Sequence, residues 1–146
     1  VVHGNFLGTE DWKFLADHRD RMSVVYCPRT HAYFSHGPYP LREMLTNGVR
    51  VALGTDSRAS NPNLSLWEEM QYVARQHPQV SAEEVLRAGT LSGAEGLGLE
   101  RDFGTISVGK VGALTMVHGG PHWAELADPA AALAALLSQG EIARGC

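Results

Sequence analysis

The chain has 146 residues, with 12 basic and 16 acidic side chains and a formal net charge of −4. A hydrophobic content of 44% and a charged content of 19% are typical of a globular protein rather than a disordered one. The mild acidity, without a lysine and arginine cluster, argues against a nucleic-acid-binding protein. Two cysteines, Cys27 and Cys146, imply no disulfide framework and favour a reducing, cytoplasmic location. No apolar run has membrane-spanning length.

The first half of the chain alternates short apolar runs with helical patterns. Strands are predicted at residues 1–3, 23–26 and 49–53, helices at residues 9–19, 41–47 and 64–76, and a polar loop at residues 27–40. Thr9 is the expected N-cap of the first helix, and Asn47-Gly48 is the expected stop of the second. Because the strands are continuous apolar runs that recur at roughly 25-residue intervals, they indicate a parallel sheet covered on both faces.

The second half has a different organisation. Ser81 and Glu84 form a capping box that predicts a short helix, and a second helix is expected from Thr90 to Leu97. Residues 104–110 and 113–117 are predicted as a turn-linked pair of strands. Asp128-Pro129 is an N-cap followed by proline at the first helical position, which predicts a helix to Gln139. The strand-like residues at both chain ends predict a fragment of a longer protein, with a processed mature chain as the alternative.

Polar side chains follow each predicted strand of the first half. His3 ends the first strand, Arg29 and His31 follow the second, and Asp56 and Ser57 follow the third. In parallel α/β proteins functional groups gather at the C-terminal ends of strands, so these side chains are expected to converge. Each also has a structural interpretation, because a histidine there is often a hydrogen-bonded rim residue and an aspartate is often an N-cap.

The sequence around Asp56 has a wider resemblance. Residues 48–61, which contain Thr55-Asp56-Ser57 and Ser60-Asn61, resemble the last barrel strand of the amidohydrolase superfamily, in the branch of nucleobase and nucleoside deaminases, triazine hydrolases and chlorohydrolases. Further segments are similar to that family in order: residues 2–5 to its sixth-strand histidine segment, 26–31 to its seventh-strand segment, 64–70 to the next helix, and 104–110 to its return to a small β-domain. After Lys110 the chain departs from the family's Ala-Asp, which puts the local β register in doubt.

The resemblance implies a fold and a division of the chain. The fold class would be α/β, with residues 1–103 as the C-terminal part, about strands 6–8, of a TIM (β/α)8 barrel. Residues 104–146 would return to the composite β-domain, with one helix intervening.

The resemblance also implies a chemistry. Asp56 would bind the catalytic metal and take a proton from the attacking water, while His3 would hydrogen-bond the nucleophile or the developing charge. Arg29, His31 and Ser57 would contact the substrate, with Ser57 also shaping the loop. One Zn²⁺ or Fe²⁺ per complete barrel is expected, as is hydrolytic deamination or dechlorination of a nitrogen heterocycle such as a nucleobase or nucleoside. Partners would be small molecules, with no nucleic acid or membrane, and a homo-oligomer of the complete protein stays open.

Most of the family's metal ligands are absent from this sequence. It contains no His-x-His pair, and a zinc site needs at least three protein ligands, so the isolated chain is expected to be inactive. His77 is expected on the exposed surface of a helix. One alternative is a non-catalytic α/β module in which Asp56 and His3 are structural. Another is a receiver-like signalling domain with Asp56 as phosphate acceptor, although the expected acidic cluster and late lysine are not visible.

Overall fold

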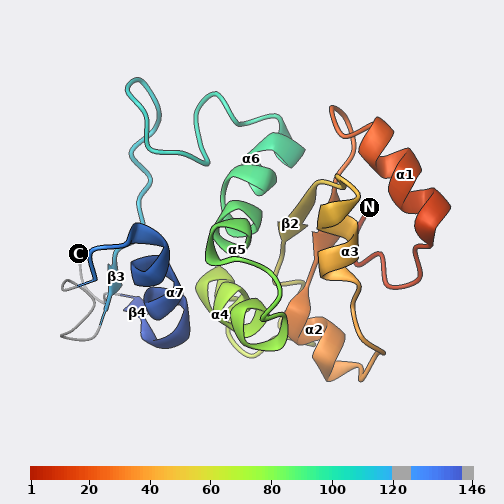
Figure 1. Ribbon diagram of the computed structural model, residues 1–146, viewed down its shortest axis with the longest axis horizontal. Helices are drawn as coiled ribbons and strands as arrows, with labels where there is room; N and C mark the ends of the chain where they lie inside the picture. Colours follow the sequence, from red (N-terminus) through yellow and green to blue (C-terminus); the bar gives the residue numbers. More distant parts are fainter. Residues whose placement is uncertain (120–125, 143–146) are drawn as a thin grey trace.

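Three parallel segments form the centre of the computed structural model, which describes residues 1–119 and 126–142 (Figure 1). β1 (Val24–Tyr26) pairs in parallel with β2 (Val51–Leu53). Val2 forms an isolated parallel bridge to Val25 on the other side of β1. β1 is therefore the middle segment, and all three C-terminal ends lie at the same edge.

Helices follow the strands where the apolar spacing predicts them. Their bounds are Thr9–Asp17 for α1, Leu41–Thr46 for α3, Leu66–Gln76 for α4, Ala82–Gly89 for α5 and Leu91–Leu97 for α6. The capping box at α5 is confirmed, because the Ser81 and Glu84 side chains each accept a hydrogen bond from the other residue's backbone N–H. Within residues 1–119 and 126–142, no helix is long and apolar enough to cross a membrane.

The core lies between the strands and their covering helices. Figure 1 shows α4, α5 and α6 on one side of β2 and α3 and α1 on the other. Val24 and Met44 are completely buried, and Val51, Val73 and Val85 are each 1% exposed. Burying such a side chain contributes roughly 1.5–3 kcal/mol, so this contact layer holds the strand ends in place.

Two local predictions in the first half are wrong. The segment expected as a loop contains α2 (Pro28–Tyr33), because proline fits the first helical turn and the Cys27 carbonyl accepts from the His31 N–H at 2.9 Å. The N-cap of α1 is Gly8, and Thr9 is already helical. The Asp11 carboxylate accepts from the Gly8 N–H at 2.8 Å and so caps the helix from inside.

The second half packs back onto these helices. α7 (Pro129–Gln139) begins as predicted at Asp128, whose carboxylate accepts from the Ala130 and Ala131 N–H groups. It packs against α4 and α5, and Leu137 is completely buried. The Trp67 indole of α4 donates to the Gly140 carbonyl at 3.0 Å, which fixes the end of α7.

The predicted strand pair at residues 104–110 and 113–117 is wrong. Instead, β3 (Val117–His118) pairs antiparallel with β4 (Glu141–Ile142), across α7 in sequence. Residues 104–116 contain no strand, and Ile106, Val108 and Leu114 are exposed. Figure 1 shows this segment arching from α6 to β3. The predicted strand at the C-terminus falls partly on residues 143–146, outside the described residues.

Candidate functional site

The predicted site residues follow the C-terminal ends of the parallel segments. His3 follows the Val2 bridge, Cys27 follows β1, and Asp56 follows β2 after a short connection. Neighbouring strands lie about 4.8 Å apart, so the strands leading to His3 and Asp56, with β1 between them, are separated by about 10 Å. His3 and Asp56 therefore follow strands that are not adjacent but lie two strand spacings apart at the same edge of the sheet.

Both His3 and Asp56 have an unusual backbone conformation. Their φ angles are +65° and +57°, in the left-handed region that favours glycine. Such a conformation costs on the order of 1–3 kcal/mol and is found preferentially at functional sites. The other non-glycine residues with positive φ in the described part of the chain are Ser35 and Leu64. The two residues predicted to be catalytic are therefore both strained.

The Asp56 carboxylate is held at one oxygen. The Ser60 hydroxyl donates to Asp56 Oδ2 at 3.0 Å, and the Thr30 hydroxyl lies 3.0 Å from the Ser60 hydroxyl. Ser60 and Thr30 are buried, whereas Asp56 is exposed. A carboxylate has about four acceptor sites, so this contact orients the group and leaves capacity for a cation or a proton. The Ser57 hydroxyl accepts from the Ala59 N–H at 3.3 Å and shapes the same loop.

Cys27 lies under the site as a buried thiol. Burial chiefly, followed by the nearby Asp56 and Glu69 carboxylates, raises its pKa to about 11. The thiol is therefore neutral at pH 7, which makes it a weak nucleophile and a poor metal ligand without further activation.

His3 is held through its backbone. Its N–H donates to the Val25 carbonyl at 2.8 Å, and its carbonyl accepts from the Tyr39 hydroxyl at 2.8 Å. The imidazole is half-buried and makes no hydrogen bond within the described residues. The backbone is therefore fixed while the ring nitrogens stay available to a ligand.

The Arg29 side chain contacts α4 and the loop after Asp56, and it makes no hydrogen bond to His3 or Asp56 among the described residues. Its Nε donates to the completely buried Glu69 carboxylate at 2.5 Å, and its Nη1 donates to Glu68 at 2.8 Å. Its Nη2 donates to the Asn61 and Asn63 side chains at 3.0 and 2.9 Å. The guanidinium thus links α2 to α4 and to the loop after Asp56. That Arg29 contacts the substrate stays a prediction. What the structure shows is that Arg29 links these elements.

Both ring nitrogens of His31 already have protein neighbours. Nδ1 lies 3.1 Å from Asn5 Oδ1, and Nε2 lies 2.7 Å from the Gly37 carbonyl oxygen. A hydrogen bond from His31 to a substrate would require one of these contacts to break. The predicted substrate contact is therefore more compatible with the ring's face or edge than with its nitrogens.

The prediction that His77 is exposed is wrong. It is 7% exposed at the end of α4, and its Nε2 lies 3.3 Å from the Tyr26 hydroxyl. Burial chiefly, and then the charge of His31, lowers the pKa of His77, although Glu43 opposes this. Burial also raises the pKa of the Tyr26 hydroxyl, so the contact joins two neutral groups near neutral pH.

Sequence reasoning also missed Glu69, Asn61 and Tyr39. Glu69 lies at helical spacing from Leu66 and Val73, on the buried face of α4, and a carboxylate on such a face is a signal that it has a partner. Tyr39 gives no comparable local signal, because it lies between two prolines in a loop. Its contact with His3 joins residues 36 positions apart.

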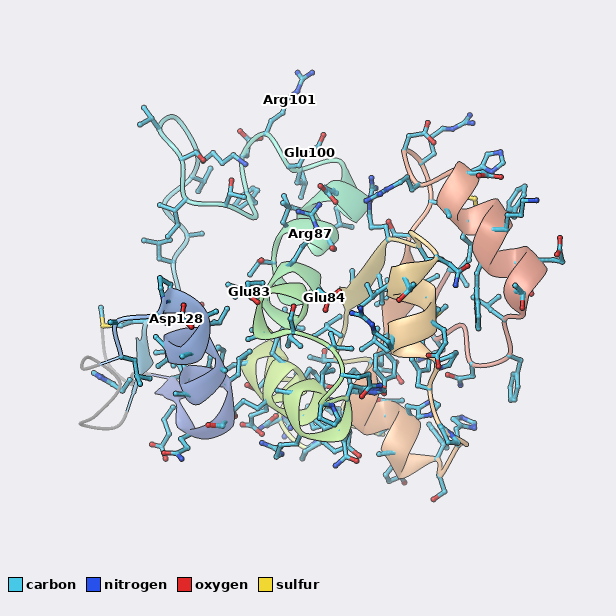
Figure 2. All side chains as sticks on the ribbon, in the orientation of Figure 1. Glu83, Glu84, Arg87, Glu100, Arg101 and Asp128 are labelled. Atoms are coloured by element: carbon cyan, nitrogen blue, oxygen red, sulfur yellow. The ribbon has the colours of Figure 1, made fainter. Side chains whose placement is uncertain are left out.

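The remaining charged side chains lie mostly away from the strand ends. Figure 2 shows Glu83 and Glu84 on opposite sides of α5, and Asp128 at the start of α7. Glu84 pairs with Arg42 of α3 at 2.9 Å. Within residues 1–119 and 126–142, no group of three or more His, Cys, Asp or Glu side chains is placed to hold a metal ion. The exposed Asp56 carboxylate fits the chemistry of a single oxygen ligand, and a zinc site would need others.

Comparison with known proteins decides the family. Residues 1–145 match the Amidohydrolase family. The chain belongs to the amidohydrolase family. Two curated amidohydrolase relatives are 5-methylthioadenosine/S-adenosylhomocysteine deaminases, from Moorella thermoacetica and Pyrococcus furiosus. Each is 36% identical, over 80% and 91% of this chain but only 28% and 33% of the relative.

A solved amidohydrolase structure has the same arrangement. An adenosine deaminase from Xanthomonas campestris with bound zinc is 29% identical to this chain and superposes with a TM-score of 0.78. The match covers 97% of this chain and 34% of that protein. The chain therefore spans about a third of the length of the amidohydrolases that it matches.

Proposed function

We propose that this chain is the C-terminal part of a metal-dependent deaminase, in which residues 1–103 supply about strands 6–8 of a TIM barrel and residues 104–146 return to a small β-domain. The complete enzyme would remove an amino group hydrolytically from a nitrogen heterocycle, such as the base of an adenosine derivative. The deaminase names of relatives that are 36% identical support deamination over dechlorination.

One observation carries the proposal. Asp56 and His3 follow parallel strands on either side of β1, at the same edge of the sheet, and both have a left-handed backbone. Left-handed backbone at residues other than glycine is found preferentially at functional sites, and here it occurs at the ends of two strands on the same edge of the sheet. The arrangement is one that a small heterocycle could occupy between a carboxylate and an imidazole.

The chain's residues would divide the chemistry as follows. A bound Zn²⁺ or Fe²⁺ lowers the pKa of its water to roughly 7 and thereby supplies hydroxide at neutral pH. Asp56 would be one ligand, and its carboxylate would accept the proton of the attacking water, with Ser60 fixing its orientation. His3 would hydrogen-bond the attacking oxygen or the charge that develops on the heterocycle. Ser57 and the face of His31 would contact the substrate.

The first prediction concerns Asp56 in the complete enzyme. Asp56→Asn should lower ammonia release from adenosine and 5-methylthioadenosine at least ~1000-fold, because it removes both a metal ligand and a proton acceptor. Metal content per chain should fall in parallel, as measured by inductively coupled plasma mass spectrometry. Asp17→Asn, at the exposed end of α1, is the matched control and should change neither quantity.

Two outcomes would contradict the proposal. If Asp56→Asn kept both metal content and turnover, Asp56 would be a structural residue of a non-catalytic module. If the complete enzyme released chloride from a chlorinated triazine but no ammonia from any aminopurine, the reaction class would be dechlorination.

A further inference from the structure

The segment between α2 and α3 covers the end of the first strand. From one side of this segment, the Tyr39 hydroxyl donates to the His3 carbonyl at 2.8 Å. From α2, which precedes this segment, His31 Nδ1 lies 3.1 Å from the Asn5 side-chain oxygen. These contacts fall on either side of Gly4, whose φ is also positive at +65°. The turn that follows the first strand is therefore held by a contact on each side of Gly4.

We propose that Tyr39 is a positioning residue for His3: its hydroxyl holds the left-handed backbone of His3 and thereby fixes where the imidazole lies relative to Asp56. The proposal rests on the proposed function, in which His3 contacts the reacting atoms. Tyr39 itself would touch neither substrate nor metal.

The Tyr39 hydroxyl is itself held firmly. The ring is 5% exposed and stacks on Tyr26 at a centroid distance of 3.7 Å and an interplanar angle of 7°. The His31 ring lies nearly perpendicular to it, at a centroid distance of 5.3 Å and an interplanar angle of 83°. Pro38 and Pro40 flank the tyrosine and restrict the backbone on both sides. The donor is thus anchored to the core and cannot follow His3 if the strand end relaxes.

The hydroxyl is a stable donor. Burial chiefly, and then the neighbouring Tyr26 and Cys27, raises the pKa of Tyr39, so the group stays protonated across the physiological range. On the opposite side of the same residue, the His3 N–H donates to Val25 of β1 at 2.8 Å. Two hydrogen bonds therefore fix the backbone of His3, whose ring has no hydrogen-bond partner among residues 1–119 and 126–142.

The alternative is that Tyr39 serves only the core, through its stacking on Tyr26. Tyr39→Phe separates the two roles, because phenylalanine keeps the ring and loses only the hydroxyl. Tyr33→Phe is the matched control, since Tyr33 lies in the neighbouring α2 and is 64% exposed.

The test uses the complete enzyme with adenosine as the probe substrate. Tyr39→Phe should lower kcat about 10-fold or more with KM within about twofold, because misplacing a catalytic group slows the chemical step more than it weakens binding. The ring NMR signals of His3, assigned by their loss in His3→Gln, should shift or broaden in Tyr39→Phe and stay unchanged in Tyr33→Phe.

The outcomes separate the inference from the proposed function. If His3→Gln kept full turnover, the role of His3 and this inference would both be wrong. If His3→Gln were inactive while Tyr39→Phe matched Tyr33→Phe in kcat and in the His3 signals, only the positioning role would be overturned. Should Tyr39→Phe not fold, the decision passes to 4-fluorophenylalanine at position 39, which fills more of the hydroxyl's space but cannot donate; unchanged kcat and unchanged His3 signals in that variant would overturn the positioning role.

Discussion

His3 and Asp56 are both strained, but different contacts hold them. His3 is fixed through its peptide groups, by Val25 and Tyr39, and its ring is left free. Asp56 is fixed through its side chain, where Ser60 donates to one carboxylate oxygen. Under the proposed function, the first arrangement would leave the imidazole of His3 able to contact a developing charge, and the second would keep Asp56 in one orientation as a metal ligand.

Cys27 provides a test of the electrostatics beneath these residues. With its pKa raised to about 11, the thiol should react with iodoacetamide at pH 8 at least ~10-fold more slowly than a free cysteine, because only the thiolate is nucleophilic. The measurement is mass spectrometry of alkylated Cys27 in the Cys146→Ser variant of the complete enzyme. Asp56→Asn should speed the reaction modestly, since it removes one of the charges that raise the pKa. Fast alkylation of the native protein would contradict the described burial.

For single residues, the sequence predicts those that lie within a recognisable local motif. His3 and Asp56 could be proposed because each directly follows an apolar strand within a recognisable segment. Tyr39 and Glu69 could not, because their importance comes from partners 36 and 40 positions away. Whether His31 points its nitrogens at a ligand or at its own loop is likewise decided by Asn5 and Gly37, which no periodicity brings together.

Among the elements, α2 is the one that connects the site to the helical layer. Arg29, in its first turn, reaches Glu69 and Glu68 of α4, and the Asn61 side chain donates to the same Glu69 carboxylate at 2.6 Å. The buried carboxylate is thus compensated by a guanidinium, an amide and the Arg29 backbone N–H. The loop that begins at Asp56 is fastened to two helices by one network.

Breaking this network should be costly. Arg29→Met leaves the Glu69 charge buried without its partner, so it should lower the free energy of unfolding by about 3–5 kcal/mol. Arg42→Met is the control: its ion pair with Glu84 is 44% and 35% exposed, and its loss should cost at most about 1 kcal/mol. Thermal and urea unfolding of the complete enzyme provide the measurement.

The double variant completes this test. Arg29→Met with Glu69→Met removes both charges and should recover much of the lost stability, since a buried ion pair often contributes little over an apolar replacement. If Arg29→Met were no more destabilising than Arg42→Met, the network would not hold the loop.

Local sequence signals predict where helices begin and end better than they predict which strands pair. The capping box of α5, the Asp-Pro start of α7 and the end of α6 at Leu97 are all present as predicted, because helix ends depend on residues within one turn. α2 is missed because a helix of 6 residues that begins with proline has too few apolar positions to show a period. The strand pairing is missed because β3 pairs with β4 across the whole of α7.

At the scale of the whole molecule, the described residues would supply one side of the proposed site. They contribute a carboxylate and an imidazole at one edge of three parallel segments, and the amidohydrolases they match are about three times as long. Family membership could be inferred from the sequence because its motifs are local and ordered. The substrate could not, because no local pattern among these residues specifies which heterocycle would lie between His3 and Asp56.

The global stability should depend on pH through His77, which links β1 to the end of α4. Its pKa is lowered in the folded state, so the unfolded chain binds the proton more tightly. The stability that His77 contributes is therefore complete above pH ~6.5 and is lost as the pH falls below that value. His77→Gln keeps a polar partner for Tyr26 without titrating. The Tm advantage of the native enzyme over this variant should shrink between pH 8 and 5.5, and a constant difference would contradict the prediction.

The fastened loop after Asp56 has a consequence for enzyme engineering. Its anchors are Asp56 and the buried Ser60 and Asn61, whereas Ser57, Arg58 and Ala59 between them are exposed. Randomising residues 57–59 therefore samples new surface chemistry beside the carboxylate while the anchors keep their geometry. In the proposed deaminase, a combinatorial library confined to these positions would vary the contacts beside Asp56 with little loss of foldable clones, whereas one that extended to residues 60 and 61 would lose many of them.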